Sequence, residues 1–297
     1  MTRQGTGGRA DIGIIGGSGL YELDGIQNLR EQKLSTPFGE PSDVFVTGTL
    51  HGKDVAFLPR HGKGHRHLPS EVPFRANVWG MKKLGVTHLI SVSAVGSLRE
   101  EIKPGHLVFP DQFIDRTFHR DSTFFGKGIV AHVQFGNPVC GDLVSVLAAS
   151  AKQEGITAHR GGTYICMEGP QFSTKAESHL YRSWGGSVIG MTNLQEAKLA
   201  REAELCFATI ALATDYDCWH ESEAEVSVEA VLEVMRNNVA ASKRLLSGAI
   251  RSLNPAQPCP DQDALRFAIL TALDRVPEST KRDLDPIIGR YVKATQR

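Results

Sequence analysis

Two kinds of apolar pattern alternate along the chain. Short β-prone runs recur, and the clearest, residues 206–212, reads Cys-Phe-Ala-Thr-Ile-Ala-Leu without a charged residue. A run of this kind predicts a strand that is buried on both faces. Segments with apolar residues at helical spacing, such as residues 74–85, lie between these runs. The alternation predicts an α/β fold, a three-layer α/β/α sandwich around a central mixed sheet.

The pattern places the expected elements as follows. Strands are predicted at 12–15, 44–50, 55–58, 88–96, 107–114, 163–166, 187–192 and 206–212, with a hairpin joining the second and third. Helices are predicted at 74–85, 143–154, 177–184 and 194–203, followed by a long helix through residues 228–239. We expect a flexible N-terminus at 1–10, one main domain at 11–252, and a helical extension at 253–297. The extension has two apolar stripes, Leu265, Ile269 and Leu273, then Leu284, Ile287, Ile288 and Tyr291.

Composition narrows the classes of function. Lys and Arg number 33 and Asp and Glu number 33, so the chain has no broad basic field for nucleic acid. Residues 1–10 lack an apolar core segment and no run is long enough to cross a bilayer, so we expect a cytoplasmic protein without a membrane anchor. The five cysteines form no CxxC motif, which argues against a metal ribbon or a disulfide, and Cys206 is interpreted as a small buried hydrophobe.

Polar residues follow several of the predicted strands. Asp215 and Asp217 end the most apolar strand, where open α/β sheets bind their ligands, although a solvated loop that caps a helix is an equal alternative for either one. The glycine-rich residues 16–19 follow the first strand and fit neither a P-loop nor a dinucleotide fingerprint. They indicate another kind of phosphate loop or a plain tight turn.

Residues 60–67 read Arg-His-Gly-Lys-Gly-His-Arg-His. The segment can be an anion site, a metal site using His61, His65 and His67, or a solvated loop. No carboxylate or cysteine is near enough in sequence to complete a metal site, which disfavours that interpretation. The planar fork of Arg60 suits phosphate. The long connection at 116–137 is typical of a lid or of a segment that reaches a partner subunit.

Taken in order, these strand ends resemble the trimeric nucleoside phosphorylases, in particular those acting on S-methyl-5'-thioadenosine, over residues 11–250. Five stretches carry the resemblance: Gly16-Gly17-Ser18-Gly19-Leu20, Pro59-Arg60-His61-Gly62, residues 167–174 (Met-Glu-Gly-Pro-Gln-Phe-Ser-Thr), Val188-Ile189-Gly190-Met191-Thr192, and residues 213–219 (Ala-Thr-Asp-Tyr-Asp-Cys-Trp). The resemblance implies a phosphorylase/hydrolase-like fold and a homotrimer or a dimer of trimers. It does not extend to the Cys-x-Cys of heat-stable members, so their disulfide is not expected.

The resemblance also assigns roles residue by residue. Phosphate is held by Ser18, Arg60, His61, Ser93, Ala94 and Thr192. The nucleoside is contacted by Met191 at the ribose, Phe172 and Ser173 at the base, Asp215 and Asp217 at the purine edge, and Val228, Val231 and Leu232 at the methylthio group. His132 is implied to reach the active site of a neighbouring subunit. No metal or cofactor is implied, since inorganic phosphate is a co-substrate.

The chemistry of the residues fits this assignment. Phosphate attacks the anomeric carbon while Asp215 protonates the departing base at N7, which requires a pKa raised by burial and by Asp217. The 6-amino group of a purine such as adenine can donate hydrogen bonds to carboxylates. A 6-oxo group would instead place one acceptor against another, and such an unpaired buried contact costs roughly 1–3 kcal/mol of binding free energy. The expected reaction is therefore phosphorolysis of S-methyl-5'-thioadenosine. Phosphorolysis of methylthioinosine or adenosine, and a non-catalytic nucleoside- or phosphate-binding protein, remain the alternatives.

Overall fold

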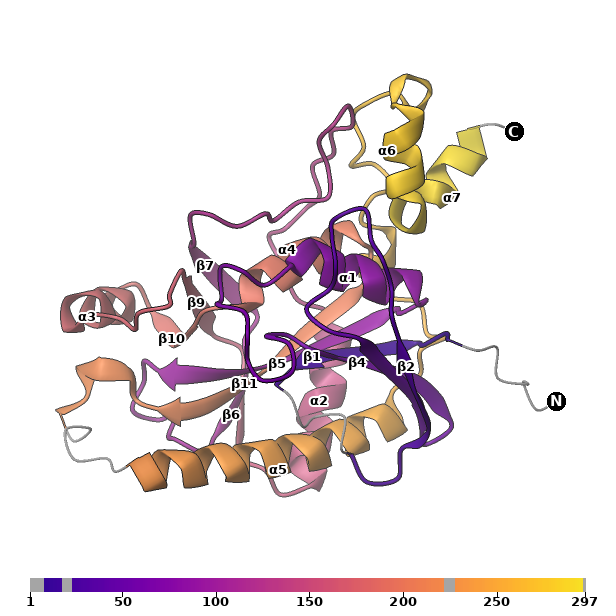
Figure 1. Ribbon diagram of the computed structural model, residues 1–297. Coiled ribbons are helices and arrows are strands. Elements are labelled where there is room, and N and C mark those ends of the chain that lie inside the picture. The colour runs from indigo at the N-terminus through magenta and orange to yellow at the C-terminus, as the bar shows by residue number, and fades with distance from the viewer. Residues whose placement is uncertain (1–7, 18–22, 222–227, 296–297) are drawn as a thin grey trace.

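A mixed β-sheet runs through the computed structural model, which describes residues 8–17, 23–221 and 228–295 (Figure 1). The strands are β1 (Ile12–Gly16), β2 (Gln27–Gln32), β3 (Phe45–Leu50), β4 (Lys53–Pro59), β5 (His88–Ser97), β6 (Leu107–Phe109), β7 (Gln112–Arg116), β8 (Ala158–Arg160), β9 (Thr163–Met167), β10 (Gly186–Gly190) and β11 (Cys206–Asp215). Their order is β2-β3-β4-β1-β5-β10-β9-β7, and β11 branches from β5 to pair with β6, which pairs with β8. The predicted hairpin is confirmed as β3 and β4.

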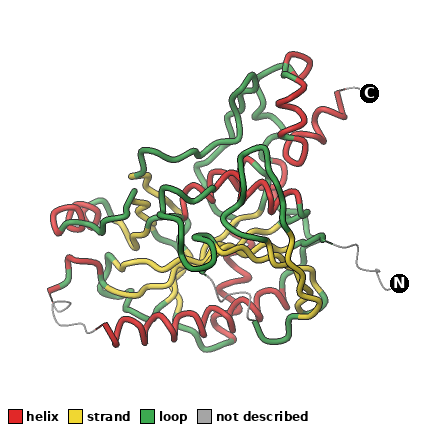
Figure 2. Tube along the Cα trace, viewed as in Figure 1, coloured by secondary structure: helices red, strands yellow, loops and turns green. Residues whose placement is uncertain are grey.

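Helices cover both faces of this sheet (Figure 2). They are α1 (Phe74–Lys83), α2 (Gly141–Gln153), α3 (Lys175–Ser183), α4 (Asn193–Glu202), α5 (Val228–Ser252), α6 (Glu278–Asp283) and α7 (Asp285–Thr295). One apolar core joins α1, α4 and α7 to the sheet, and a second joins α2 and α5 to its other face. The predicted three-layer α/β/α sandwich with a mixed sheet is therefore confirmed. No helix among the residues described above is long and apolar enough to cross a membrane.

Three local predictions were wrong. The single strand expected at 107–114 is two strands, because β6 pairs with β11 whereas β7 pairs with β9. The stripe from Leu265 to Leu273 does not form one helix: Leu265 lies in a turn, Ile269 forms a bridge with Ala131, and Leu273 begins a short 3-10 helix. The edge strands β2 and β8 were not predicted, because β2 is largely exposed and β8 has only three residues. In the second C-terminal stripe, Ile287, Ile288 and Tyr291 lie in α7 and Leu284 is the C-cap of α6; Leu284, Ile287 and Ile288 are buried.

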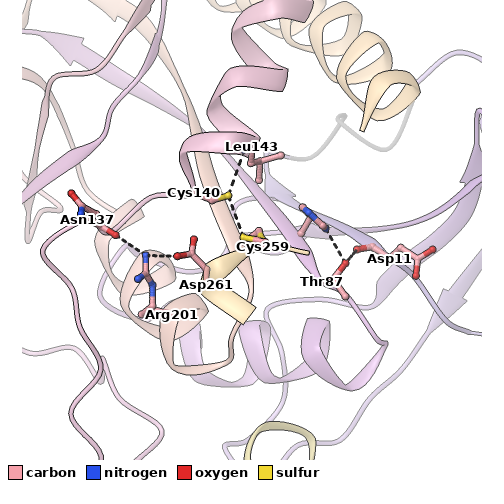
Figure 3. Close-up of a disulfide and its surroundings, with 10 residues drawn as sticks. Asp11, Thr87, Asn137, Cys140, Leu143, Arg201, Cys259 and Asp261 are labelled. Atoms are coloured by element: carbon pink, nitrogen blue, oxygen red, sulfur yellow. Dashed lines mark hydrogen bonds and ion pairs between the residues drawn. A yellow bond between two sulfur atoms is a disulfide. The ribbon is translucent and has the colours of Figure 1, made fainter. Parts of the chain in front are cut away.

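The cysteine prediction was also wrong. Cys206, the first residue of β11, is bonded to Cys259, which is 53 residues away and follows the end of α5. The Sγ atom of Cys140, the N-cap of α2, lies 3.5 Å from that of Cys259 (Figure 3). All three sulfurs lie within 4.8 Å of one another. Sequence spacing could not show this cluster, because the fold brings together a strand start, a helix start and a C-terminal loop.

Candidate active site

Several strand ends meet at one edge of the sheet. β1 pairs in parallel with β4 and β5, and β5 pairs in parallel with β11, so the residues that follow these strands lie near one another. β10 is antiparallel to β5 and pairs Ile189 with Gly96, which brings its last residue, Gly190, beside Val95. In Figure 1, β5 and β11 run side by side toward α3 and the start of α5. The predicted ligand residues from distant parts of the chain therefore collect at this edge.

Arg60 follows β4 and is buried, with 2% exposure. Its Nε donates to Glu196 Oε1 at 2.5 Å and its Nη2 donates to Glu196 Oε2 at 3.0 Å. Nη1 of Arg60 donates to the carbonyl oxygen of Val92, and Nη2 donates to the carbonyl oxygen of Ile15 and to the hydroxyl of Ser91. Burial acts against the charge of Arg60, but the charge and hydrogen bonds of Glu196 raise its pKa. Most N–H groups of the Arg60 guanidinium thus donate to protein atoms. Two of these bonds reach β1 at Ile15 and β5 at Val92, just before the phosphate candidates at residues 16–17 and Ser93.

Glu196 is the buried partner of Arg60, a pairing that the sequence did not reveal. It lies on α4, 136 residues from Arg60, and it also accepts a hydrogen bond from Ser91. Asn193, on the first turn of α4, donates to Ser91 and accepts from Thr209 on β11. This buried network fixes the start of α4 against β4, β5 and β11.

His61 lies beside Arg60 and is partly buried. Its Nδ1 donates to the carbonyl oxygen of His67 at 2.9 Å, and its ring stacks on His65 with 4.2 Å between centroids. Burial, aided by the charge of Arg60, lowers the pKa of His61 to about 4 against the opposing hydrogen bond to His67. The ring is therefore neutral at pH 7, and its second nitrogen is an acceptor.

The remaining phosphate candidates flank these residues. Ala94 is exposed at the sheet edge, whereas Ser93 is 7% exposed and its hydroxyl has no hydrogen-bond partner among the described residues. Thr192 is the N-cap of α4, and its hydroxyl makes no capping bond. A helix N-terminus next to free hydroxyls is suited to an anion, because the backbone N–H groups and the helix dipole point to it. Ser18 lies outside the described residues.

Asp215 is the last residue of β11, and Asp217 follows two residues later. Asp215 Oδ1 accepts from the backbone N–H of Asp217 at 2.8 Å, and Oδ2 accepts from Thr214 Oγ1 at 2.7 Å. Asp217 accepts from Ser178 Oγ on α3 at 2.5 Å and has a φ of 49°, which is uncommon for a residue other than glycine. Burial raises the pKa of Asp217, the Asp215 charge adds to this, and the Ser178 bond opposes it. Within this pair, a raised pKa is therefore found at Asp217.

The base and sugar candidates come from two neighbouring loops. Phe172 is 84% exposed, and the carbonyl oxygen of Ser173 accepts from Cys218 Sγ at 3.2 Å, which ties this loop to the segment after Asp217. Met191 follows β10 and lies against Gly169. Val228, Val231 and Leu232 fall in the first turns of α5, but their side chains lie outside the described residues.

His132 lies in the long connection between β7 and α2. Its side chain is exposed and its backbone N–H donates to the carbonyl oxygen of Ala268 at 2.9 Å. Figure 1 shows this connection extending beside α6 and away from α3. The same connection contains Arg120, which sequence reasoning missed. Arg120 donates to Glu168 Oε1 and to the carbonyl oxygens of Met167 and Met191, so it holds together the two loops that carry the base and sugar candidates.

Glycines give two of these side chains the space they occupy. A Cβ atom on Gly96 would lie 3.0 Å from Asp215 Oδ1, and one on Gly169 would lie 2.5 Å from the sulfur of Met191. Contacts this short displace either the backbone or the side chain. Gly96 and Gly169 are therefore matched to Asp215 and Met191.

Comparison with known proteins agrees with this geometry. Residues 11–251 match the Phosphorylase superfamily, and the chain belongs to this family. The S-methyl-5'-thioadenosine phosphorylase of Geobacter sulfurreducens is 62% identical over 282 residues, which cover 95% of this chain and 99% of that protein. The protein of the same name from Koribacter versatilis is 57% identical over 283 residues, covering 95% and 97%. A crystal structure of a methylthioadenosine phosphorylase from an Antarctic soil metagenomic library has a TM-score of 0.92 and 47% identity, covering 94% of this chain and 99% of that one. The predicted family resemblance is thus confirmed.

Proposed function

We propose that this protein is a pentosyltransferase that phosphorolyses S-methyl-5'-thioadenosine to adenine and 5-methylthioribose 1-phosphate. The observation that carries the proposal is that two groups of residues lie at one edge of the sheet. One is the pair of carboxyls at the end of β11, Asp215 and Asp217, and the other is the set of phosphate candidates at the ends of β1, β4, β5 and β10. The names of the most similar relatives support the choice of substrate. A protein that merely binds a nucleoside has no use for both groups in one site.

Phosphate is the nucleophile in this reaction, so the protein has to position it rather than supply a nucleophile. Ser93, Ala94, Thr192 and the N-terminus of α4 hold the anion, with Ser18 and His61 completing the site. Arg60 acts mainly by holding the carbonyl oxygens of Ile15 and Val92, and thereby the strand ends, at a fixed separation. A metal or cofactor has no part in the proposal.

The leaving purine gains negative charge as the glycosidic bond breaks. The pair formed by Asp215 and Asp217 offers two carboxyl groups in one place, and burial raises the pKa of Asp217, which favours its protonated form. Asp215, the acceptor of two hydrogen bonds, is assigned to assist departure of the base at N7. Phe172 and Ser173 cover the base, and Met191 lies under the ribose.

Choice among purines follows from the same pair. The 6-amino group of adenine donates to carboxylate oxygens, whereas a 6-oxo group repels them. Val228, Val231 and Leu232 are apolar residues of the helix that begins beyond the site, and they suit a methylthio group better than a hydroxyl. Methylthioinosine and adenosine phosphorolysis are the alternatives within this fold.

We also propose that the protein works as a homotrimer, or as a dimer of trimers, in cytoplasmic purine and methionine salvage. The exposure of His132, on a connection that extends away from α3 in its own subunit, supports a contact with the site of a neighbour. Arg120 joins that connection to the loops at Glu168 and Met191.

A rate comparison tests the function. Purified protein is given S-methyl-5'-thioadenosine, methylthioinosine or adenosine at equal concentration, with and without phosphate, and release of free base is followed. We expect adenine release from S-methyl-5'-thioadenosine to be fastest and to require phosphate. Phosphate-independent release of adenine would contradict phosphorolysis, and faster cleavage of methylthioinosine would contradict the substrate assignment.

A further inference from the structure

The space around Gly190 points to a further residue near the phosphate candidates, Tyr164, which lies outside the motif at residues 188–192. A Cβ atom on Gly190 would lie 2.0 Å from the hydroxyl oxygen of Tyr164 and 2.7 Å from the ring carbon that bears it. No positive φ demands glycine at this position, so the requirement is one of space. Gly96, which also has no positive φ, leaves room for Asp215 in the same way. By the same reasoning, Gly190 is there to admit the hydroxyl group of Tyr164.

The Tyr164 side chain reaches from β9 toward the phosphate candidates. β9 pairs with β10, Cys166 being opposite Gly190, so the ring passes Gly190 in the direction of β5. Tyr164 is fully buried, and its hydroxyl and that of Ser93 are both buried without a hydrogen-bond partner in the part of the chain that the structure describes. The Tyr164 hydroxyl lies at Gly190 together with Val95, and Ser93 is two residues before Val95 on β5, so the Ser93 side chain is on the same face of that strand. Hydrogen bonding with Ser93 acts against the burial that raises the pKa of Tyr164. Two neighbouring buried hydroxyls without good partners are costly unless a ligand completes them.

Burial decides which of the two hydroxyls meets the ligand. Tyr164 has no exposed surface, whereas Ser93 retains 7% exposure and precedes the exposed Ala94. Ser93 therefore lies between Tyr164 and the space where phosphate binds. A serine hydroxyl has one proton to donate and two lone pairs, so it can donate to an anion and accept from a phenol at once.

We propose that Tyr164 is a positioning residue of the phosphate site. Its phenol donates a hydrogen bond to Ser93 Oγ, and the Ser93 hydroxyl in turn donates a hydrogen bond to the bound phosphate. This inference rests on the proposed function, because it takes Ser93 as a phosphate ligand. The phenol stays protonated at neutral pH, because burial raises the pKa of Tyr164 and so disfavours the phenolate. The chain of two donors aligns the Ser93 proton before phosphate arrives, which strengthens phosphate binding without touching the nucleoside.

The test is the substitution Tyr164→Phe, which removes the hydroxyl and keeps the ring. We expect the KM for phosphate, and the Kd for inorganic phosphate measured by calorimetry, to rise about 5- to 30-fold. The KM for the nucleoside and the melting temperature should change little, because the proposed bond to Ser93 does not involve the nucleoside and the hydroxyl has no other hydrogen-bond partner among the described residues. Tyr181→Phe, at a buried tyrosine on α3, is the matched control and should leave the phosphate constants unchanged.

A double-mutant cycle with Ser93→Ala separates the possible failures. If Tyr164 acts through Ser93, Tyr164→Phe has no further effect on phosphate affinity once Ser93 is alanine. Additive losses would overturn the role through Ser93, and an unchanged phosphate constant in Tyr164→Phe beside a weakened Ser93→Ala would overturn the inference alone. If Ser93→Ala itself binds phosphate normally, the phosphate site of the proposed function is wrong.

Discussion

Replacing Glu196 by glutamine tests whether the buried ion pair holds the phosphate site together. The side chains of Arg60 and Glu196 are 3% and 1% exposed, so the substitution leaves the Arg60 charge buried without its counter-charge. The glutamine side chain has one oxygen to serve three donors, namely Nε and Nη2 of Arg60 and the hydroxyl of Ser91. Two charge-assisted hydrogen bonds are lost or weakened at about 1.5–3 kcal/mol each, and breaking a buried pair typically costs about 3–5 kcal/mol.

We therefore expect Glu196→Gln to lower the free energy of unfolding by about 3–5 kcal/mol and the melting temperature by on the order of 10 °C. Urea denaturation and calorimetry at one fixed protein concentration measure this, because subunit association would otherwise change the result. The KM for phosphate should also rise, since Arg60 fixes the carbonyl oxygens of Ile15 and Val92.

The matched control for this prediction is Glu101→Gln. Glu101 is paired with Arg99 at 3.5 Å, with side-chain exposures of 62% and 44%, so its loss should cost about 0.5 kcal/mol or less. If Glu196→Gln is within about 1 kcal/mol of the wild type, the charge of Arg60 does not depend on Glu196 and the reasoning is refuted.

Three further predictions concern the carboxyl pair, the disulfide and His61. Asp217→Asn should lower kcat at least about 100-fold while leaving stability equal or higher, because it removes a carboxyl whose raised pKa reports a burial cost; an active variant would remove Asp217 from proton transfer. Reducing the disulfide, or replacing Cys259 by serine, should lower the free energy of unfolding by up to about 4 kcal/mol, because the cross-link closes a loop with a sequence separation of 53. If the urea midpoint of the wild type does not change with reductant, Cys206 and Cys259 are not bonded in solution. His61 has a folded pKa of about 4, below the ordinary value of 6.5, so the folded state binds fewer protons than the unfolded chain between these values. Stability should fall by about 2 kcal/mol from this residue between pH 7 and pH 4, and His61→Asn should flatten that part of the pH profile; an identical profile would contradict the lowered pKa.

Much of the fold was predictable because its information is local. The β11 segment is apolar throughout and the α1 segment repeats at helical spacing, and both formed as expected. Thr174 and Glu177 form a capping box at the start of α3, a signal contained in four consecutive residues. The position of Asp215 at the end of a buried strand could likewise be read from neighbours in sequence, as could the five stretches that resemble the phosphorylases.

The roles of individual polar groups were less predictable. The apparent phosphate fork of Arg60 is largely used by Glu196, a partner 136 residues away. The raised pKa of Asp217 was not predicted, because its burial and its contact with Ser178 depend on how α3 packs against the segment after β11.

Local sequence was enough to show where most strands end and which chemical groups stand there, because backbone periodicity and turn residues act over a few positions. Which of these groups are buried and paired depended on the packing of the whole chain. Strand pairing brings Tyr164 to Gly190, whereas the packing of a loop and of α4 on the sheet brings Cys259 to Cys206 and Glu196 to Arg60. None of these pairs is close in the chain. Burial and charge pairing depend on those long-range contacts, so the electrostatics of the site follow from the fold and not from the motif.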